Sequence, residues 1–95
     1  MSNIESRTRN RTLEFKKTTG ELKEGVVSIA AILNKHQKGE LYFGIKPDGT
    51  PIGQQISEKT LRDISQEIAN HIEPRIYPEI AVIHIDDKDC IHCQF

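Results

Sequence analysis

The 95-residue sequence has no tryptophan, and aromatic residues make up only 5% of it. Hydrophobic residues reach 36%, which allows one small core in a single domain near the lower size limit for independent folding. No apolar run approaches the roughly 18 residues of a membrane span, and the polar start MSNIESRTRNRT is not a secretory signal. We therefore expect a cytoplasmic domain with no membrane partner.

Cysteine is also scarce, since Cys90 and Cys93 are the only two in the chain. Two cysteines are too few for a disulfide scaffold. A structural zinc site needs four ligands, and a redox C-x-x-C pair normally starts a helix. Here the pair lies in a strand-like segment, where residues three apart point to opposite faces. We interpret both as small strand residues and predict neither a metal site nor a cofactor.

The net charge is only −1, but the charge is unevenly distributed along the chain. Residues 1–46 contain nine lysines and arginines against five acids, whereas residues 47–95 contain four against nine. This asymmetry predicts a positive surface formed by the first half of the chain. The alternative is that folding mixes the two halves and leaves no patch.

The hydrophobic pattern predicts five strands. The first alternates, with Leu13 and Phe15 on one side, as in a half-buried strand. The turn sequence PDGT separates the second strand from a short return strand or bulged extension. The predicted strand segments are TLEFK (12–16), ELYFGIK (40–46), PIGQQI (51–56), EIAVIHI (79–85) and CIHCQF (90–95).

Two amphipathic helices are predicted between these strands. Thr18 and Glu21 have the spacing of a capping box for the first helix, which should end near Asn34. Ser57 caps the second helix, which Pro74 ends. Gly25 weakens the first helix but permits close packing. The apolar stripes comprise Leu22, Val26, Ile29, Ala30 and Leu33 in the first helix, and Leu61, Ile64, Ile68 and Ile72 in the second.

Together these elements predict an α+β fold in the order β-α-β-β-α-β-β. Each helix has one apolar stripe, so both can pack on one face of a mixed β-sheet. Residues 1–11 form a basic N-terminal arm, and residues 12–95 form the domain. The sequence stops inside an apparent strand, so we expect a fragment truncated at its C-terminus.

The stretch GELYFGIKPDGTPIG resembles a phosphate-binding loop in its spacing. Gly39 and Gly44 are separated as in the motif G-x-x-x-x-G-K-[ST]. However, Ile45 intervenes before Lys46, and Pro47 replaces the hydroxyl residue. The residues between the two glycines are also typical of a strand. We therefore predict a strand, a turn and a return segment rather than a Walker-type site.

Basic residues are the main candidates for ligand contacts. They suit a phosphate backbone, where each neutralised phosphate releases counterions, although the pattern alone fits an ordinary solvated surface equally well. Tyr42 and Phe43 offer a stacking surface, but one of them must be buried. The predicted nucleic-acid-binding residues are Arg7, Arg9, Arg11, Lys16, Lys17, Lys35, Lys38 and Lys46, gathered on one face.

Carboxylates supply an alternative, catalytic hypothesis. A metal-dependent nuclease needs several acids that converge on one or two cations. Glu14, Glu5 and Asp48 are the candidates, but Asp48 is typical of a turn, and Glu14 is equally explained as a strand residue paired with a lysine.

The ordered set LEFK, G-x-L-Y-F-G-I-x-x-D-G and G-Q-Q resembles the Schlafen-type AlbA-like domain, also called the divergent AAA N-terminal domain, over about residues 5–95. The resemblance implies an α/β sandwich-like fold and nucleic-acid binding within bacterial transcriptional regulators. Some relatives are ribonucleases, and Glu14 matches one of their acids. Glu5 lies farther upstream than the family spacing, and Lys46 and Pro47 stand where a third acid is expected.

We therefore predict a nucleic-acid-binding domain of a bacterial transcriptional regulator, with DNA favoured over RNA and homodimerisation open. This domain alone is not assigned an enzymatic activity. Three alternatives stay open: a metal-dependent ribonuclease, an ATP-binding divergent AAA module, for which no Walker motif is present, and a protein-interaction or dimerisation module.

Overall fold

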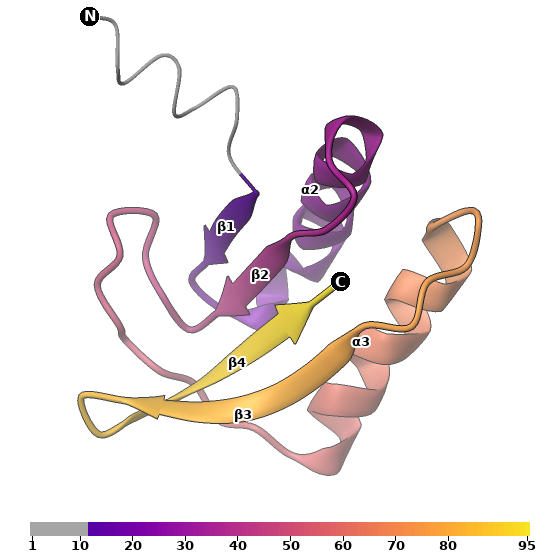
Figure 1. Cartoon of the computed structure of the whole chain (residues 1–95). Helices are drawn as coiled ribbons and strands as arrows, with labels where there is room; N and C mark the ends of the chain where they lie inside the picture. The colour runs from indigo at the N-terminus through magenta and orange to yellow at the C-terminus, as the bar shows by residue number, and fades with distance from the viewer. Residues whose placement is uncertain (1–11) are drawn as a thin grey trace, which may run out of the picture.

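Four strands within residues 12–95 form one mixed sheet (Figure 1). The computed structural model describes residues 12–95, and the predicted basic arm lies outside this range. The strands β1 (Leu13–Lys16), β2 (Glu40–Phe43), β3 (Glu79–Ile85) and β4 (Lys88–Gln94) are arranged in the order β1-β2-β4-β3. Strands β1 and β2 are parallel, whereas β4 is antiparallel to both β2 and β3. The predicted α+β class is therefore confirmed.

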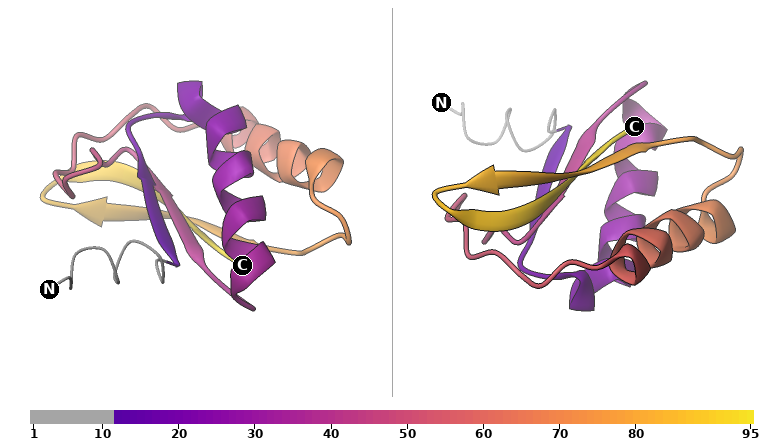
Figure 2. Two further views of the ribbon diagram at one scale, coloured as in Figure 1. Left: turned by 90° about the horizontal axis from the view of Figure 1, so that it is seen from above. Right: turned by 90° about the horizontal axis from the view of Figure 1, so that it is seen from below.

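Two helices, α2 (Leu22–Lys35) and α3 (Glu58–His71), pack on the same side of this sheet (Figures 1 and 2). Because side chains alternate along a strand, only every second strand residue faces the helices. Among residues 12–95, no helix covers the opposite side, which we call the open face. The core between helices and sheet contains Val26, Ile29, Leu41, Phe43, Ile64, Ile68, Ile72, Ile91 and Cys93.

The first helix packs closely on β2 at Gly25. A Cβ atom at this position would lie 3.1 Å from Leu41 Cδ2 and 3.2 Å from Phe43 Cζ. The predicted apolar stripe is present, and the fully buried Ile29 lies at its centre. Ile32, which the stripe omitted, is also buried. The close-packing role predicted for Gly25 is therefore confirmed.

The starts of the two helices differ. Ser57 caps α3 as predicted, but its reciprocal partner is the Thr60 hydroxyl. Thr18 caps a preceding 3₁₀ turn, η1 (Thr19–Glu21), by accepting from Gly20 N. Glu21 reaches back to Lys17 N at 3.0 Å. In the predicted capping box, Thr18 and Glu21 would each accept from the backbone N–H of the other. Instead, each side chain accepts from the residue before that one, Gly20 and Lys17 respectively.

Strand β1 alternates as predicted, but its apolar side faces away from the helices. Phe15 pairs with Tyr42, and their rings lie 5.6 Å apart on the open face. Glu14 pairs with the core residue Leu41, so the polar side of this edge strand lies on the helix side. All four β1 residues are partly buried.

The return segment after β2 is limited to one isolated bridge, between Ile45 and Pro51. Pro51 has no N–H with which to extend a ladder, and Gly53 adopts a φ of 75°. The backbone N–H groups of Gly44 and Ile45 both donate to Lys16 O, at 2.8 and 3.2 Å. These amides hold the sheet together instead of forming a phosphate cradle.

Gln54 fastens the return segment to the first helical turn. Its Oε1 accepts from Thr19 N at 2.9 Å, and its Nε2 donates to Thr19 Oγ1 at 3.0 Å. The two residues are 35 positions apart. The first glutamine of the G-Q-Q signature is therefore a structural clamp.

Candidate functional site

The predicted basic residues occur at two ends of the parallel pair β1–β2. Lys35 ends α2, and Lys38 lies just before β2. Lys16 and Lys17 lie at the other end, where Gly44 N donates to Lys16 O, and Lys46 follows two residues after Gly44. The ends are about 10 Å apart, at about 3.3 Å per residue. Among the described residues, these lysines therefore form two groups, one at each end of the pair.

The group at the start of β2, Lys35 and Lys38, is exposed. Within residues 12–95 neither lysine has an acidic partner. Glu40 N donates to Thr12 O at 2.8 Å, which places the attachment point of the preceding arm beside these lysines. The predicted contacts Arg7, Arg9 and Arg11 lie outside the described residues.

The lysines at the other end are less uniform. Lys16 Nζ lies 3.6 Å from Glu14 Oε2, and only 19% of its side chain is exposed. Its charge is therefore largely compensated. Lys17 and Lys46 are exposed, although Lys46 interacts electrostatically with Asp48. Lys17 is the better candidate for a ligand contact at this end.

The carboxylates of the nuclease hypothesis already have structural partners. Glu14 pairs with Lys16, and Asp48 accepts from Thr50 N at 2.9 Å in the turn. The hydrogen bonds from Thr50 and, to a lesser degree, the charge of Lys46 lower the pKa of Asp48. Glu5 lies outside the described residues. Across residues 12–95, no three histidine, cysteine or acidic side chains are grouped closely enough to hold a metal ion.

A row of rings crosses the open face of the sheet. Phe15, Tyr42 and His92 occupy paired positions on β1, β2 and β4. The rings of Tyr42 and His92 are stacked, with centroids 4.6 Å apart and planes 26° from parallel. Phe43 is fully buried in the core. Of the two aromatic residues predicted as a stacking surface, Tyr42 is therefore the one on the open face.

Glu40 fixes two of these rings. Its Oε1 accepts from the Tyr42 hydroxyl at 3.2 Å and lies 2.8 Å from His92 Nε2. An ionised carboxylate only accepts hydrogen bonds, so Nε2 carries the hydrogen. Burial, together with the charge and hydrogen bond of Glu40, raises the pKa of Tyr42 above 10.0. The Tyr42 hydroxyl therefore remains a hydrogen-bond donor to Glu40.

The two cysteines lie on opposite faces of β4, as predicted. Cys93 belongs to the core cluster, whereas Cys90 lies beneath Gly44 and donates to its carbonyl at 3.5 Å. Burial raises the pKa of both thiols, that of Cys93 to about 12. This placement prevents the pair from coordinating one ion together.

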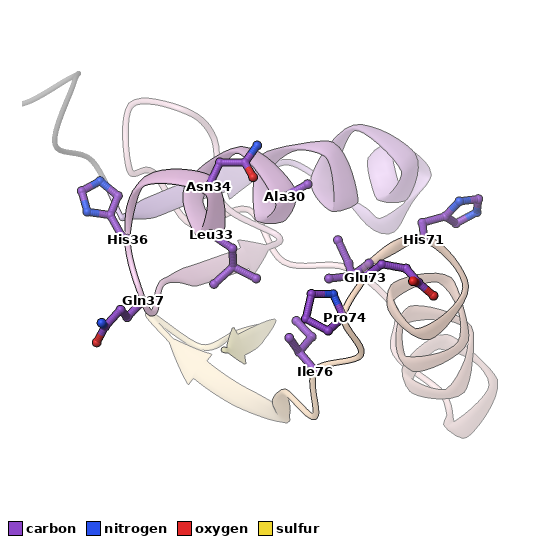
Figure 3. Close-up of a pocket in the computed structure, with 10 residues that line it drawn as sticks. Ala30, Leu33, Asn34, His36, Gln37, His71, Glu73, Pro74 and Ile76 are labelled. Atoms are coloured by element: carbon purple, nitrogen blue, oxygen red, sulfur yellow. The ribbon is translucent and has the colours of Figure 1, made fainter.

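A groove of about 570 Å³ separates the C-terminal ends of α2 and α3 (Figure 3). Leu33, Pro74 and Ile76 converge in its middle. His36 Nε2 is buried at one end without a hydrogen-bond partner among the described residues. The lining combines apolar side chains with polar ones, among them His36, His71 and Glu73.

The fold and the ordered motifs define a small α+β domain with a mixed four-stranded sheet. The chain belongs to the Schlafen AlbA_2 family, whose pattern it matches over residues 10–94. The resemblance to Schlafen-type AlbA-like domains is thereby confirmed. No curated protein matches the chain significantly. In residues 12–95 no helix has the length and apolar character to cross a bilayer.

Two solved structures share the fold. One is the solution structure of the N-terminal domain of an ATP-dependent DNA helicase RecG-related protein from Nitrosomonas europaea, with 15% identity and a TM-score of 0.67 over 95% of this chain and 67% of that one. The other is the DIP2311 protein from Corynebacterium diphtheriae, with 16% identity and a TM-score of 0.68 over 87% of this chain and 19% of that one. At these identities the likeness concerns the fold.

Proposed function

We propose that this domain binds the phosphate backbone of nucleic acid, with DNA preferred over RNA, as part of a bacterial cytoplasmic transcriptional regulator. The observation that carries the proposal is the pair Lys35 and Lys38, exposed and without acidic partners among residues 12–95, beside the attachment point of an arm that contains three arginines. Cations grouped in this way gain free energy by releasing counterions from phosphates.

Two further facts support the proposal. Lys17 adds an exposed cation at the far end of β1, so a backbone that crosses the sheet would meet positive charge at both ends. Family membership agrees with such a role, and one structural neighbour is named as related to a DNA helicase. Backbone contacts of this kind are largely independent of sequence.

The test is fluorescence anisotropy with labelled single-stranded DNA, double-stranded DNA and RNA over a salt series. We expect log K to fall linearly with log[salt]. Lys38→Glu and Lys17→Glu, one from each end, should each reduce the salt slope by about 1. The matched control is Lys59→Glu, because Lys59 already pairs with Asp63 at 2.9 Å on the exposed side of α3.

Absence of binding at low salt would refute the proposal, as would equal effects of the control and the two test variants. The same preparation addresses the nuclease alternative. Cleavage of structured RNA with Mg²⁺ or Mn²⁺ that disappears in Glu14→Gln would replace backbone binding with a catalytic function.

A further inference from the structure

The ring row on the open face has four places, but only three of them hold a ring. Phe15 of β1, Tyr42 of β2 and His92 of β4 supply the rings, and the next paired position is Ala81 of β3. Ala81 is exposed and contributes only a methyl group. We infer that a base of single-stranded nucleic acid lies over Ala81, stacked on the ring face of His92 that points away from Tyr42.

The spacing of the row supports this ligand. The ring centroids are 5.6 Å apart between Phe15 and Tyr42 and 4.6 Å apart between Tyr42 and His92. Both distances are close to the spacing of adjacent strands, about 4.8 Å. The Phe15 and Tyr42 rings are tilted by 52°, so the stacked part of the row is the pair Tyr42 and His92. A planar group placed over β3 continues this stacked pair without any movement of the sheet. Every nucleobase has such a plane, so the contact is tolerant of sequence.

The His92 ring is held in position before the ligand arrives. Glu40 Oε1 binds His92 Nε2 at 2.8 Å and also accepts from the Tyr42 hydroxyl. Only 22% of the His92 side chain is exposed, so the ring loses little freedom when a base stacks on it. Because the ring is already fixed, less of the stacking free energy is spent on ordering the side chain when a base binds.

The surroundings of Ala81 suit the edges and the apolar plane of a base. The adjacent row on the open face ends in Gln94 and Glu79, which pair with each other. Their amide and carboxylate can bind the exocyclic amino groups of bases. On the other side of Ala81, the partly buried Ile83 offers an apolar surface. These neighbours favour a base over a purely aliphatic group.

This inference rests on the proposed function, because the lysines at the two ends of β1–β2 would hold the phosphates of the same strand. The bases in a duplex already stack on one another, so only a single strand can present one to His92. The inference therefore narrows the ligand from nucleic acid in general to unpaired nucleotides.

The test compares three labelled ligands of equal length: a single-stranded oligonucleotide, an oligonucleotide whose sugars carry no bases, and a duplex. All three present phosphates, but only the first presents unpaired bases. We expect the full 95-residue chain to bind the single strand about tenfold more tightly than the abasic strand. The fluorescence of 2-aminopurine in the single strand should also fall on binding, as the base stacks.

Two variants locate the contact. Ala81→Leu fills the fourth place, and His92→Ala removes the platform. Each should lower affinity for the single strand to that for the abasic strand and leave the abasic affinity and its salt slope unchanged. Val82→Leu is the matched control, because Val82 pairs with the core residue Ile91 and so points to the opposite face. Circular dichroism verifies folding of each variant.

The outcomes separate this inference from the proposed function. Equal affinity for single and abasic strands would overturn base stacking but leave backbone binding intact. Loss of base preference in Val82→Leu, or its retention in Ala81→Leu, would also overturn the assignment to Ala81. If no ligand binds, the proposed function fails and the inference fails with it.

Discussion

Cys93 allows the packing of the core to be tested through pH. Its thiol is fully buried in the core cluster, and burial raises its pKa from 9.0 to about 12. The folded state therefore keeps the proton in a pH range where the unfolded chain releases it. Because the pKa is raised on folding, the stabilisation is complete below pH 9 and is lost as the pH rises toward 12.

The expected loss follows from the two pKa values. Between pH 8 and pH 10 the free energy of unfolding should fall by about 1.4 kcal/mol through Cys93 alone. Urea unfolding of the native sequence and of Cys93→Ala under reducing conditions at both pH values isolates this contribution. Burial also raises the pKa of Cys90, but Cys90 is present in both proteins, so its contribution to the pH dependence cancels in the comparison.

The two proteins should therefore become closer in stability as the pH rises, although Cys93→Ala is less stable at pH 8. A constant difference between them across this range would refute the reasoning. Rapid reaction of Cys93 with a thiol reagent in the folded state would do so as well, because a thiol enclosed by the core reacts only after the protein opens.

Two further substitutions test the contacts that join distant segments. Gln54→Ala removes both hydrogen bonds to Thr19 and should lower the free energy of unfolding by about 1–3 kcal/mol in a urea titration. The control is Gln55→Ala, at the exposed neighbouring position. Equal losses of stability in the two variants would contradict the role of Gln54. Gly39→Ala introduces a Cβ atom 2.6 Å from Ile32 Cγ2 and should cost about 1–3 kcal/mol by the same measurement, whereas an unchanged or higher midpoint would contradict the crowding.

The helices were predictable because their signals are local. An apolar residue every three or four positions defines the buried face of α2, and the cap at Ser57 defines the start of α3. The orientation of β1 was not predictable in this way. Leu13 and Phe15 alternate as in any half-buried strand, but β1 lies at the sheet edge, where the register with β2 decides which side faces the helices.

The candidate site was predictable in its residue types but not in its arrangement. Sequence identified the lysines and narrowed the stacking residue to Tyr42 or Phe43. It gave no indication of the partnership with His92, because the insertion of β4 between β2 and β3 brings residues 40 and 92 together. The same pairing makes Ala81 the fourth member of the row. These contacts depend on the order of strands in the sheet, which no short sequence motif indicates.

The central place of β4 in the sheet has a consequence for how the two halves of the domain are joined. Strand β4 comes after β1, β2 and β3 in the chain, yet it joins β2 to β3 and supplies Ile91 and Cys93 to the core. Asp86 and Asp87 both have positive φ angles, of 51° and 62°, typical of a tight hairpin turn, so β3 and β4 can pair locally. The pairing of β4 with β2 therefore brings the β3–β4 hairpin and the β1–β2 pair together into one sheet over one core.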